Sequence, residues 1–241
     1  MKYAIVTDIH EDLEALTLVI RDIKNIRVNE IICLGDVIGY NSTYYKFTRN
    51  DFSANKCYEI LRQNNAKILN GNHDIYHLSK ILKKQFSKIV DKFPDFFNKI
   101  NNEYSYNDQD VTLSERNLKI YDDVKFELVI NDIGFSHFLY PNTFGWYQLP
   151  KNHLESVKSH FKRMILLSTK IWFIGHLHSS AMQLITNLDS KYFRSDEKTI
   201  ISSDNLNIVN CPPICRSQNN TSAYTIYDSK TYELYYKTVN L

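Results

Sequence analysis

The stretch YAIVTDIH, residues 3–10, is a short apolar run that ends in a carboxylate and an imidazole. Four later segments repeat this design: IICLGDVIGY (31–40), KILNGNHD (67–74), GFSHF (134–138) and IWFIGHLH (171–178). Short apolar runs suit buried strands, and open α/β sheets collect ligand sites at the ends of such strands. We therefore interpret the polar groups at these positions as one site, formed by Asp8, His10, Asp36, Asn72, His73, His137, His176 and His178.

The placement of glycine supports this interpretation. The chain has only six glycines, and Gly35, Gly71 and Gly175 each stand directly before a proposed site residue. Glycine allows a sharp turn at the end of a strand and lets the backbone approach a ligand closely. In so glycine-poor a sequence, this placement favours a built site over coincidence.

The side chains of the site indicate the kind of ligand. Carboxylate, amide and imidazole groups in this number suit two divalent metal ions of borderline or hard character, in place of a structural zinc ion. They favour Mn²⁺, Fe²⁺, Ni²⁺ or Zn²⁺ over Ca²⁺, with Mn²⁺ as the first choice. The sequence therefore predicts a dinuclear metal site.

Each residue also has a structural alternative when it is taken alone. Asp8 can be the N-cap of the following helix, and Asn72 can cap a turn. A single histidine at the end of a strand, such as His137, is as often a hydrogen-bonded structural residue as a ligand. Only the combination of the motifs, in their order along the chain, favours the metal site.

Taken in order, the motifs DxH, GD, GNHD, a single H and GHxH resemble those of the calcineurin-like metallophosphoesterase superfamily. LGDVIGY and the late segment IVNCPPICRSQNNTSAYTIYD (208–228) are similar to its small bacterial branch, the YfcE-like phosphodiesterases. The chain departs from that branch at residues 210–216, where relatives carry a glycine-rich NPGSVGQPR-like loop and this sequence has NCPPICR. It also departs from the protein-phosphatase branch, because Gly39 and Tyr40 replace the Asp-Arg pair of GDxxDRG.

The resemblance implies a role for each site residue. One metal would be held by Asp8, His10, Asp36 and His178, and the other by Asp36, Asn72, His137 and His176, with the Asp36 carboxylate bridging the two. Alternate residues of an extended segment point the same way, which lets both members of DxH or of GHxH face one cavity. His73 is the candidate general acid for the leaving group, and Asp74 is the candidate residue that orients His73 or raises its pKa. A hydroxide held between the metals is the expected nucleophile.

The order of apolar runs predicts an α/β fold. We expect strands at 2–7, 30–34, 66–69, 125–130, 133–138 and 170–174, helices at 11–24, 53–64 and 154–167, and a strand-rich chain from residue 180 onward. This alternation indicates parallel strands joined by right-handed crossovers. The resemblance implies the four-layer α/β/β/α sandwich of the metallophosphoesterases, as a single domain over residues 1–241. Residues 77–121, after the GNHD motif, are predicted to be a helical insertion that covers one side of the site.

Composition limits the class of protein. Hydrophobic residues make up 43% and charged residues 23% of the chain, which is typical of a soluble globular protein. The balance of 29 basic and 27 acidic residues gives no electrostatic reason to expect duplex nucleic acid as a partner. No apolar stretch has membrane-spanning length, and the N-terminus is already strand and motif, so we expect no membrane partner, no signal peptide and a cytoplasmic location. The four cysteines are expected to be free thiols.

Some residues outside the motifs have two interpretations. The aromatic segment after His137 forms either a wall on which a nucleobase or aryl group stacks or a packed core, which we favour. Its members are Tyr140, Phe144, Trp146 and Tyr147. Arg216 is a candidate contact for phosphate. The remaining histidines are expected to be surface or helix residues: His77, His153 and His160.

Together these observations predict a metal-dependent phosphodiesterase that acts on a small phosphorylated compound or a nucleotide. A phosphomonoesterase is the nearest alternative. The alternative from another class is a metal-binding regulatory or scaffold protein on the same fold, without turnover. A homo-oligomer is compatible with the sequence.

Overall fold

The computed structural model describes residues 1–41, 45, 53–81, 111–119, 125–141, 154–187, 189–216 and 221–240. Its strands form two six-stranded sheets. The first has the order β3 (Lys67–Ile68), β2 (Glu30–Cys33), β1 (Lys2–Val6), β11 (Thr221–Asp228), β12 (Glu233–Asn240) and β9 (Thr199–Ile200). The second has the order β4 (Glu127–Ile130), β5 (Ile133–Ser136), β6 (Ile171–Ile174), β10 (Asn207–Asn210), β7 (Gln183–Thr186) and β8 (Ser190–Tyr192).

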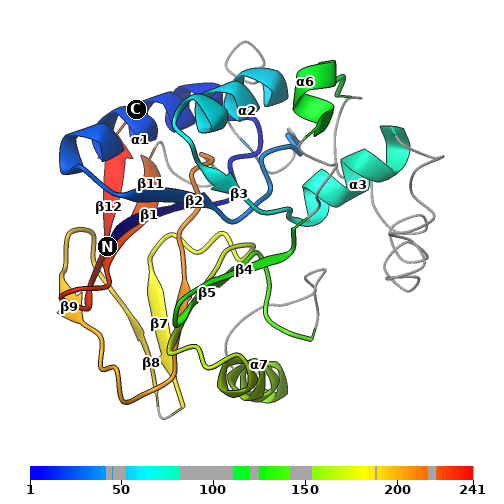
Figure 1. The fold of residues 1–241 in the computed structure, drawn as a ribbon. Coiled ribbons are helices and arrows are strands. Elements are labelled where there is room, and N and C mark those ends of the chain that lie inside the picture. The colour runs from blue at the N-terminus through cyan, green and yellow to red at the C-terminus, as the bar shows by residue number, and fades with distance from the viewer. Residues whose placement is uncertain are drawn as a thin grey trace.

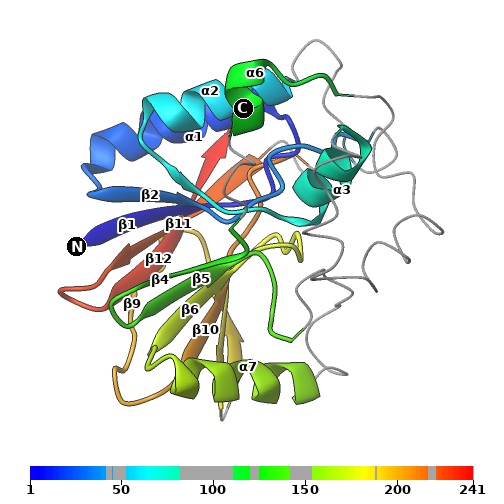
Figure 2. The same ribbon diagram turned by 45° about the vertical axis from the view of Figure 1, so that its right-hand side comes forward.

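Helices cover the outer faces of the two sheets (Figures 1 and 2). Helices α1 (Leu13–Ile26) and α2 (Ala54–Gln63), with the short α6 (Glu115–Leu118) beside α2, lie on the first sheet, and α7 (Leu154–Leu166) lies on the second. The layers therefore follow one another as helix, sheet, sheet and helix. The predicted α/β sandwich is confirmed.

Parallel pairing aligns the strands that carry the motifs. β1 pairs in parallel with β2, and β2 with β3, while in the second sheet β5 and β10 both pair in parallel with β6. Because parallel strands end at the same edge of a sheet, the segments after them meet there. The late strand β11 pairs antiparallel with β1, so the end of the chain borders its beginning.

Helix α1 shows how the sequence places a layer. Leu16, Val19, Ile20 and Ile23 are buried at helical spacing and pack on the first sheet. The helix was predicted from Glu11, but it begins at Leu13 because the Asp12 side chain caps it, accepting a hydrogen bond from the amide of Ala15 at 3.1 Å.

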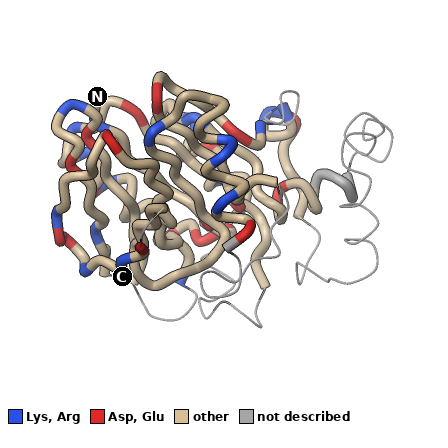
Figure 3. The backbone as a smooth tube through the Cα atoms, turned by 90° about the horizontal axis from the view of Figure 1, so that it is seen from below, with Lys and Arg blue, Asp and Glu red and all other residues tan. Residues whose placement is uncertain are grey.

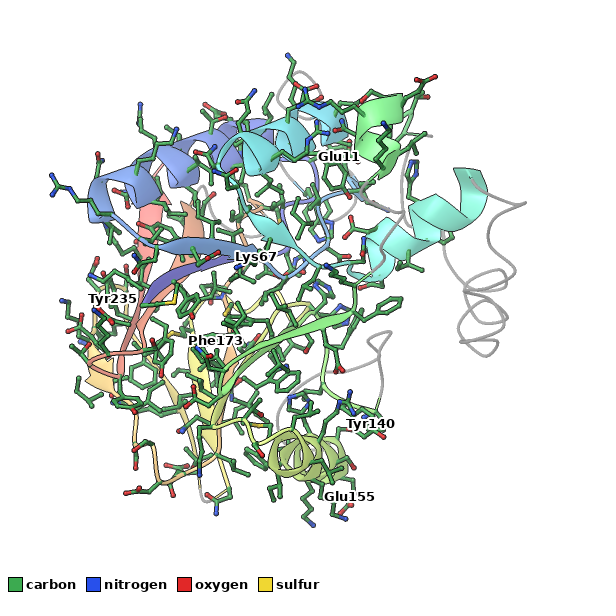
Figure 4. All side chains as sticks on the ribbon, in the orientation of Figure 1. Glu11, Lys67, Tyr140, Glu155, Phe173 and Tyr235 are labelled. Atoms are coloured by element: carbon green, nitrogen blue, oxygen red, sulfur yellow. The ribbon has the colours of Figure 1, made fainter. Side chains whose placement is uncertain are left out.

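Three apolar clusters fill the spaces between the layers. One lies between α1, α2 and the first sheet, one lies between the sheets, and the third lies between the second sheet and α7. Phe173 belongs to the cluster between the sheets, and Figure 4 shows its ring among the neighbouring side chains. Burying one such side chain stabilises the fold by roughly 1.5–3 kcal/mol, so these clusters fix the distance between the layers.

The helical insertion stays a prediction, because residues 82–110 and 120–124 lie outside the described residues. Helix α3 (Asn72–Ile81) extends into the first residues of the predicted insertion, and α6 lies near the end of the insertion. The strands β8 and β9 were not predicted individually, because they are only three and two residues long and are largely exposed. A strand that short has no alternating pattern to detect.

The structure tests two further predictions, on the cysteines and on the remaining histidines. All four cysteines are free, as expected, and all four are buried. His77 and His160 were expected on the surface or on helices, and they do lie on helices, but both are buried, with 2% and 1% of their surface exposed. His153 lies outside the described residues.

The surface has no single-sign character along the described part of the chain. Figure 3 shows basic and acidic segments interspersed on it. Within the same residues, no helix combines the length and apolar character that crossing a membrane requires.

Candidate metal centre

All the predicted ligands meet where the parallel strands of the two sheets end. The segments after β1, β2 and β3 supply Asp8, His10, Asp36, Asn72 and His73, and those after β5 and β6 supply His137, His176 and His178. The site therefore bridges the two sheets. Its residues are buried or nearly so, and His178, the most accessible of those in ion pairs, has 24% of its side chain exposed.

Two carboxylates form the middle of the site. Asp36 Oδ2 lies 3.1 Å from His137 Nε2 and 3.8 Å from His10 Nε2. Asp8 Oδ1 lies 3.2 Å from His178 Nε2, 3.7 Å from His137 Nε2 and 3.9 Å from His10 Nε2. Each carboxylate thus faces imidazoles from both sheets.

The imidazoles also face one another and the amide. His10 Nε2 and His178 Nε2 are 3.0 Å apart, and His176 Nδ1 lies 3.1 Å from Asn72 Oδ1. The ring of His73 lies edge-on to that of His10, with 4.8 Å between centroids. Ring nitrogens and carboxylate oxygens that converge in this way present their lone pairs to a common centre.

The backbone of the site is held in an uncommon conformation. Asp8, His10, Asp36, His176 and His178 all have positive φ, between 45° and 72°. Residues with side chains rarely adopt this left-handed region, and where they do, the strain clusters at functional sites. The turns that aim these side chains are therefore enforced by the surrounding fold.

Two of the glycines are required by close contacts at the site. A Cβ atom at Gly71 would lie 2.1 Å from Asp36 Oδ1, and one at Gly175 would lie 2.0 Å from Thr7 Oγ1. Any larger residue at either position would displace a carboxylate or the hydroxyl that supports one. The predicted importance of these glycines has this steric origin.

Asp74 binds the loops that carry several of the predicted ligands. Its carboxylate accepts hydrogen bonds from the amides of Asp36 at 2.7 Å and Gly71 at 3.0 Å, and from the Tyr58 hydroxyl at 3.1 Å. It also accepts from the two amides that follow Asp36, at 3.0 and 3.1 Å. Burial, together with the nearby Asp36 carboxylate, raises the pKa of Asp74 to about 7. The predicted link between Asp74 and His73 stays a prediction.

Other hydrogen bonds orient the carboxylates of Asp8 and Asp36. Thr7 Oγ1 donates to Asp8 Oδ2 at 2.8 Å, and the amide of His176 donates to the same oxygen at 2.9 Å. The amide of His73 donates to Asp36 Oδ1 at 2.9 Å. Asp36 thus has one oxygen held by a backbone amide while the other faces imidazoles, whereas the His176 amide also reaches Asp8 Oδ1, at 3.2 Å.

The electrostatics of the site keep both carboxylates ionised. Burial acts to raise the pKa of Asp8, but the imidazoles of His137 and His178 outweigh burial and hold it below its usual range. At Asp36, too, burial acts to raise the pKa. The neighbouring histidines outweigh it, His137 most of all, and hold the pKa of Asp36 far below normal. Burial lowers the pKa of His176 to about 4, so its ring is neutral and able to donate a lone pair at neutral pH.

The residues present fit two divalent ions. Among the described residues, neither ring nitrogen of His137 has a hydrogen bond of good geometry, although Nε2 lies 3.1 Å from Asp36 Oδ2, and a metal ion beside Asp36 would take up the Nε2 lone pair. Metal-binding atoms of Asp36, His137 and His176 lie within 4.8 Å of one another, and so do those of His10, Asp36 and His73. Asp36 is common to both sets, as a bridging ligand would be. The donor set of oxygen and nitrogen suits ions of borderline character.

Sequence reasoning missed several residues around the site. Tyr45 stacks on the ring of His10, with 4.7 Å between centroids, and Cys215 Sγ lies 3.9 Å from His178 Nδ1. Cys215 arrives there because its amide donates to the carbonyl of Asp8, next to β1. No sequence motif predicts these contacts, because the residues in contact are distant in sequence.

Arg216 is engaged by carboxylates of the protein. Its Nε and Nη2 donate to the Asp12 carboxylate at 2.8 Å each, and its Nη1 donates to Glu14 at 3.0 Å. These contacts fasten the segment after β10 to the start of α1. A contact between Arg216 and phosphate, which the sequence suggested, stays a prediction.

Comparisons with known proteins identify the family of the chain and proteins of similar fold. Residues 1–180 match the calcineurin-like phosphoesterase family. An uncharacterized protein of Methanocaldococcus jannaschii is 26% identical over 237 residues, covering 96% of this chain and 84% of that protein. A metallophosphoesterase from Sphaerobacter thermophilus has a similar structure, with a TM-score of 0.70 and 18% identity over 100% of this chain and 89% of that chain. The matched structures also include the phosphoesterase YfcE from E. coli, with a TM-score of 0.42 and 15% identity over 95% of this chain and 89% of that chain.

Proposed function

The chain belongs to the calcineurin-like phosphoesterase family, and we propose that it hydrolyses a phosphodiester bond in a small phosphorylated compound or nucleotide. The observation that carries this proposal is the position of Asp36. One carboxylate oxygen lies 3.1 Å from an imidazole of the second sheet and 3.8 Å from an imidazole of the first. A carboxylate shared in this way by two groups of ligands suits a pair of metal ions.

We assign the ligands to two ions. One ion would be held by Asp8, His10, Asp36 and His178, and the other by Asp36, Asn72, His137 and His176. The contacts between Asp8 and His178 and between Asn72 and His176 support this division, because each pair lies within one proposed set. Mn²⁺ is the proposed native metal, since carboxylate, amide and imidazole ligands suit it.

When bound, the two ions supply an activated water and neutralise charge on the phosphoryl oxygens. The protein positions the ligands on enforced turns, which avoids reorganisation during the reaction. His73 is proposed to donate the proton that the leaving oxygen needs. A Cβ atom at Gly39 would lie 2.3 Å from His73 Nδ1, so this glycine makes room for the ring in its position.

The test uses purified protein loaded separately with Mn²⁺, Ni²⁺, Fe²⁺ and Zn²⁺. Metal content is measured per chain, and hydrolysis is followed with bis(p-nitrophenyl) phosphate and, in parallel, with p-nitrophenyl phosphate. We expect two metal ions per chain and faster turnover of the diester. Faster turnover of the monoester would make the protein a phosphomonoesterase. Two bound ions without turnover of either ester would favour a regulatory or scaffold role.

Three further points belong to the same proposal. We propose that residues 1–241 act as a single domain, that the protein is cytoplasmic, and that duplex nucleic acid is not its partner. The near balance of 29 basic and 27 acidic residues supports the last point. Size-exclusion chromatography with light scattering tests whether the chain also forms a homo-oligomer.

A further inference from the structure

Glu11 is a buried acidic residue in a strained backbone conformation. It stands directly after His10, between β1 and α1, and Figure 4 shows it close to α2. Only 3% of its surface is exposed, and its φ of 68° lies in the left-handed region, which favours glycine. A residue with a side chain in this region costs conformational energy, and burial of a carboxylate adds a cost of desolvation. The contacts of the carboxylate must offset both.

Backbone amides supply these contacts. Glu11 Oε1 accepts hydrogen bonds from the amide of Gly39 at 3.1 Å and from that of Tyr40 at 3.3 Å. Burial raises the pKa of Glu11, and these two amides act against the shift together with a third, that of Ala54 at the start of α2. Amides bond strongly to an ionised carboxylate, and the N-terminus of a helix favours a negative charge. Glu11 therefore anchors two separate pieces of backbone, residues 39–40 and the first turn of α2.

One peptide unit connects this anchor to His10. The N–H of the peptide between Gly39 and Tyr40 donates to Glu11 Oε1 at 3.3 Å, and the C=O of the same peptide lies 3.2 Å from His10 Nδ1. A carbonyl oxygen can only accept, so Nδ1 carries the proton of a neutral His10 ring and Nε2 keeps its lone pair. Nε2 is the atom that faces the two carboxylates in the middle of the site, at 3.8 and 3.9 Å. The position of this peptide thus selects the tautomer of His10 that can bind a metal ion.

The anchored segments touch two further rings at the site. A Cβ atom at Gly39 would lie 2.3 Å from His73 Nδ1, so this glycine lies directly against the His73 ring. Tyr45, which stacks on His10, belongs to the stretch of chain between the two pieces of backbone that Glu11 anchors. The contacts of Glu11 therefore bear on the surroundings of His10 on more than one side.

We propose that Glu11 is a positioning residue of the metal centre. Its carboxylate holds the peptide between Gly39 and Tyr40, and this peptide holds His10 with the Nε2 lone pair toward the ion. Glu11 acts through the peptide and is not itself a ligand. Groups that orient metal-binding histidines typically contribute about 10–100-fold to metal affinity. This inference rests on the proposed metal centre, because it assigns the support of one proposed ligand.

Three variants separate the hydrogen bonds of Glu11 from its charge and from the strain of its backbone. Glu11→Gln removes the charge but keeps an oxygen that can accept from Gly39 and Tyr40. Glu11→Met keeps an unbranched side chain without that acceptor. Glu11→Gly also lacks the acceptor but suits the left-handed backbone, so it carries the test if Glu11→Met does not fold. Leu61→Ala, which opens a cavity in the core beneath α2, is the control for lost stability alone.

The first measurement is the tautomer of His10 in the full-length, metal-free protein. Long-range ¹H–¹⁵N NMR distinguishes a proton on Nδ1 from one on Nε2, and the His10 signal is assigned through its absence in His10→Gln. We expect the Nδ1–H form in the unmodified protein, in Glu11→Gln and in Leu61→Ala, and a mixture of tautomers in Glu11→Met and Glu11→Gly. An unchanged Nδ1–H form in the last two variants would overturn the proposed role.

The second measurement is the affinity for Mn²⁺, followed through the EPR signal of the free ion. We expect Glu11→Met and Glu11→Gly to weaken the binding of one ion about tenfold, the lower end of the range for groups that orient a ligand, because Glu11 acts through an intervening peptide. Glu11→Gln should lose less, and Leu61→Ala should bind as the unmodified protein does. Equal losses in Glu11→Gln and Glu11→Met would show that only the charge matters and would overturn the role of the hydrogen bonds.

Failure of this inference differs from failure of the proposed reaction. A protein that binds no Mn²⁺, but in which the tautomer of His10 depends on Glu11, would overturn the metal-dependent reaction and leave the support of His10 standing. Metal-dependent hydrolysis of bis(p-nitrophenyl) phosphate, with tautomer and Mn²⁺ affinity the same in all Glu11 variants, would overturn the inference and leave the reaction standing.

Discussion

The Nε2 atoms of His10 and His178 lie 3.0 Å apart, although the two residues are separated by 168 positions in the sequence. Two ring nitrogens at this distance cannot both carry a proton. They either share one proton or direct both lone pairs at a cation, and the second arrangement satisfies both rings. A bound ion would therefore tie the two sheets together, and this coupling should be measurable in the stability of the protein.

Metal binding should stabilise the fold. At a Mn²⁺ concentration about 100 times its dissociation constant, the free energy of unfolding should rise by about 2.7 kcal/mol per independent site. Urea titrations with and without Mn²⁺ measure this increase. Asp36→Asn should reduce the increase and lower the metal content, because the bridging anion is lost. An Asp36→Asn protein that still binds two ions would contradict the bridging role.

His73→Gln should affect leaving groups unequally. If His73 donates a proton to the leaving oxygen, turnover should fall by roughly 100-fold or more for esters of alkyl alcohols, which leave poorly without protonation. Nitrophenyl esters should lose much less, since nitrophenolate leaves unprotonated. Steady-state kinetics on one ester of each kind decide the question, and equal losses on both would exclude the proposed acid.

Gly71→Ala and Gly134→Ala form a matched pair of steric tests. A Cβ atom at Gly71 would meet Asp36 Oδ1 at 2.1 Å, whereas one at Gly134 would meet the Trp172 ring at 1.9 Å. Overpacking of this kind destabilises a protein by about 1–3 kcal/mol, so both variants should unfold at lower urea concentrations. Only Gly71→Ala should also lose metal, as measured per folded chain. Equal metal content in both would show that the loop of Asp36 tolerates displacement.

Asp74→Asn should destabilise the fold more than Tyr58→Phe does. The carboxylate accepts from four backbone amides and from Tyr58, and an amide side chain turns a donor toward some of these groups. Leaving buried donors unsatisfied costs about 1–3 kcal/mol each. Removing the Tyr58 hydroxyl eliminates its bond to Asp74 together with the donor, and loss of that bond should cost about 1 kcal/mol. Similar unfolding midpoints for the two variants would argue against this role of Asp74.

His160 should make the stability of the protein depend on pH. Burial lowers its pKa to about 3 in the folded state, whereas an exposed histidine titrates near about 6.5. The stability that the neutral His160 ring gives the folded protein is therefore complete above pH 6.5 and is lost as pH falls toward 3. The reason is that His160 of the unfolded chain binds a proton at a higher pH than His160 of the folded chain does. The loss is at most about 1.4 kcal/mol per pH unit. Urea titrations from pH 7.5 to 5 should show a shallower decline for His160→Gln than for the unmodified protein.

The layers, and the residues that meet between the two sheets, were predictable from sequence because both depend on local patterns. Apolar runs predicted the strands that carry the motifs, parallel pairing of β1 with β2 brought Asp8 and Asp36 to one edge of the first sheet, and packing of the two sheets brought His137 beside them. Nothing in such a pattern reveals how a residue acts on backbone groups. Asp74 was noticed only as a neighbour of His73, whereas its carboxylate binds the amides of two loops.

Other features depend on contacts between distant segments. Arg216 and Asp12 pair across 204 positions, so the sequence could not distinguish a structural arginine from one that binds phosphate. His160 lies on the buried side of α7, where its neighbour is Trp172, at 4.8 Å between ring centroids. A single polar residue on an amphipathic helix gives no sign of the sheet residue it will meet.

The pairing of β1 with β11 has a consequence for biosynthesis. Strand β1 lies between β2 and β11, so one of its edges is paired only when residues 221–228 have been synthesised. In addition, the amides of Ile214 and Cys215 donate hydrogen bonds to the carbonyls of Thr7 and Asp8. A nascent chain on the ribosome exposes one edge of β1 until those residues emerge. Assembly of the loops that carry the proposed ligands therefore waits until residues 214–228 have emerged, and products that stop short of β11 would leave Asp8 and His10 unsupported and the open strand edge prone to aggregation.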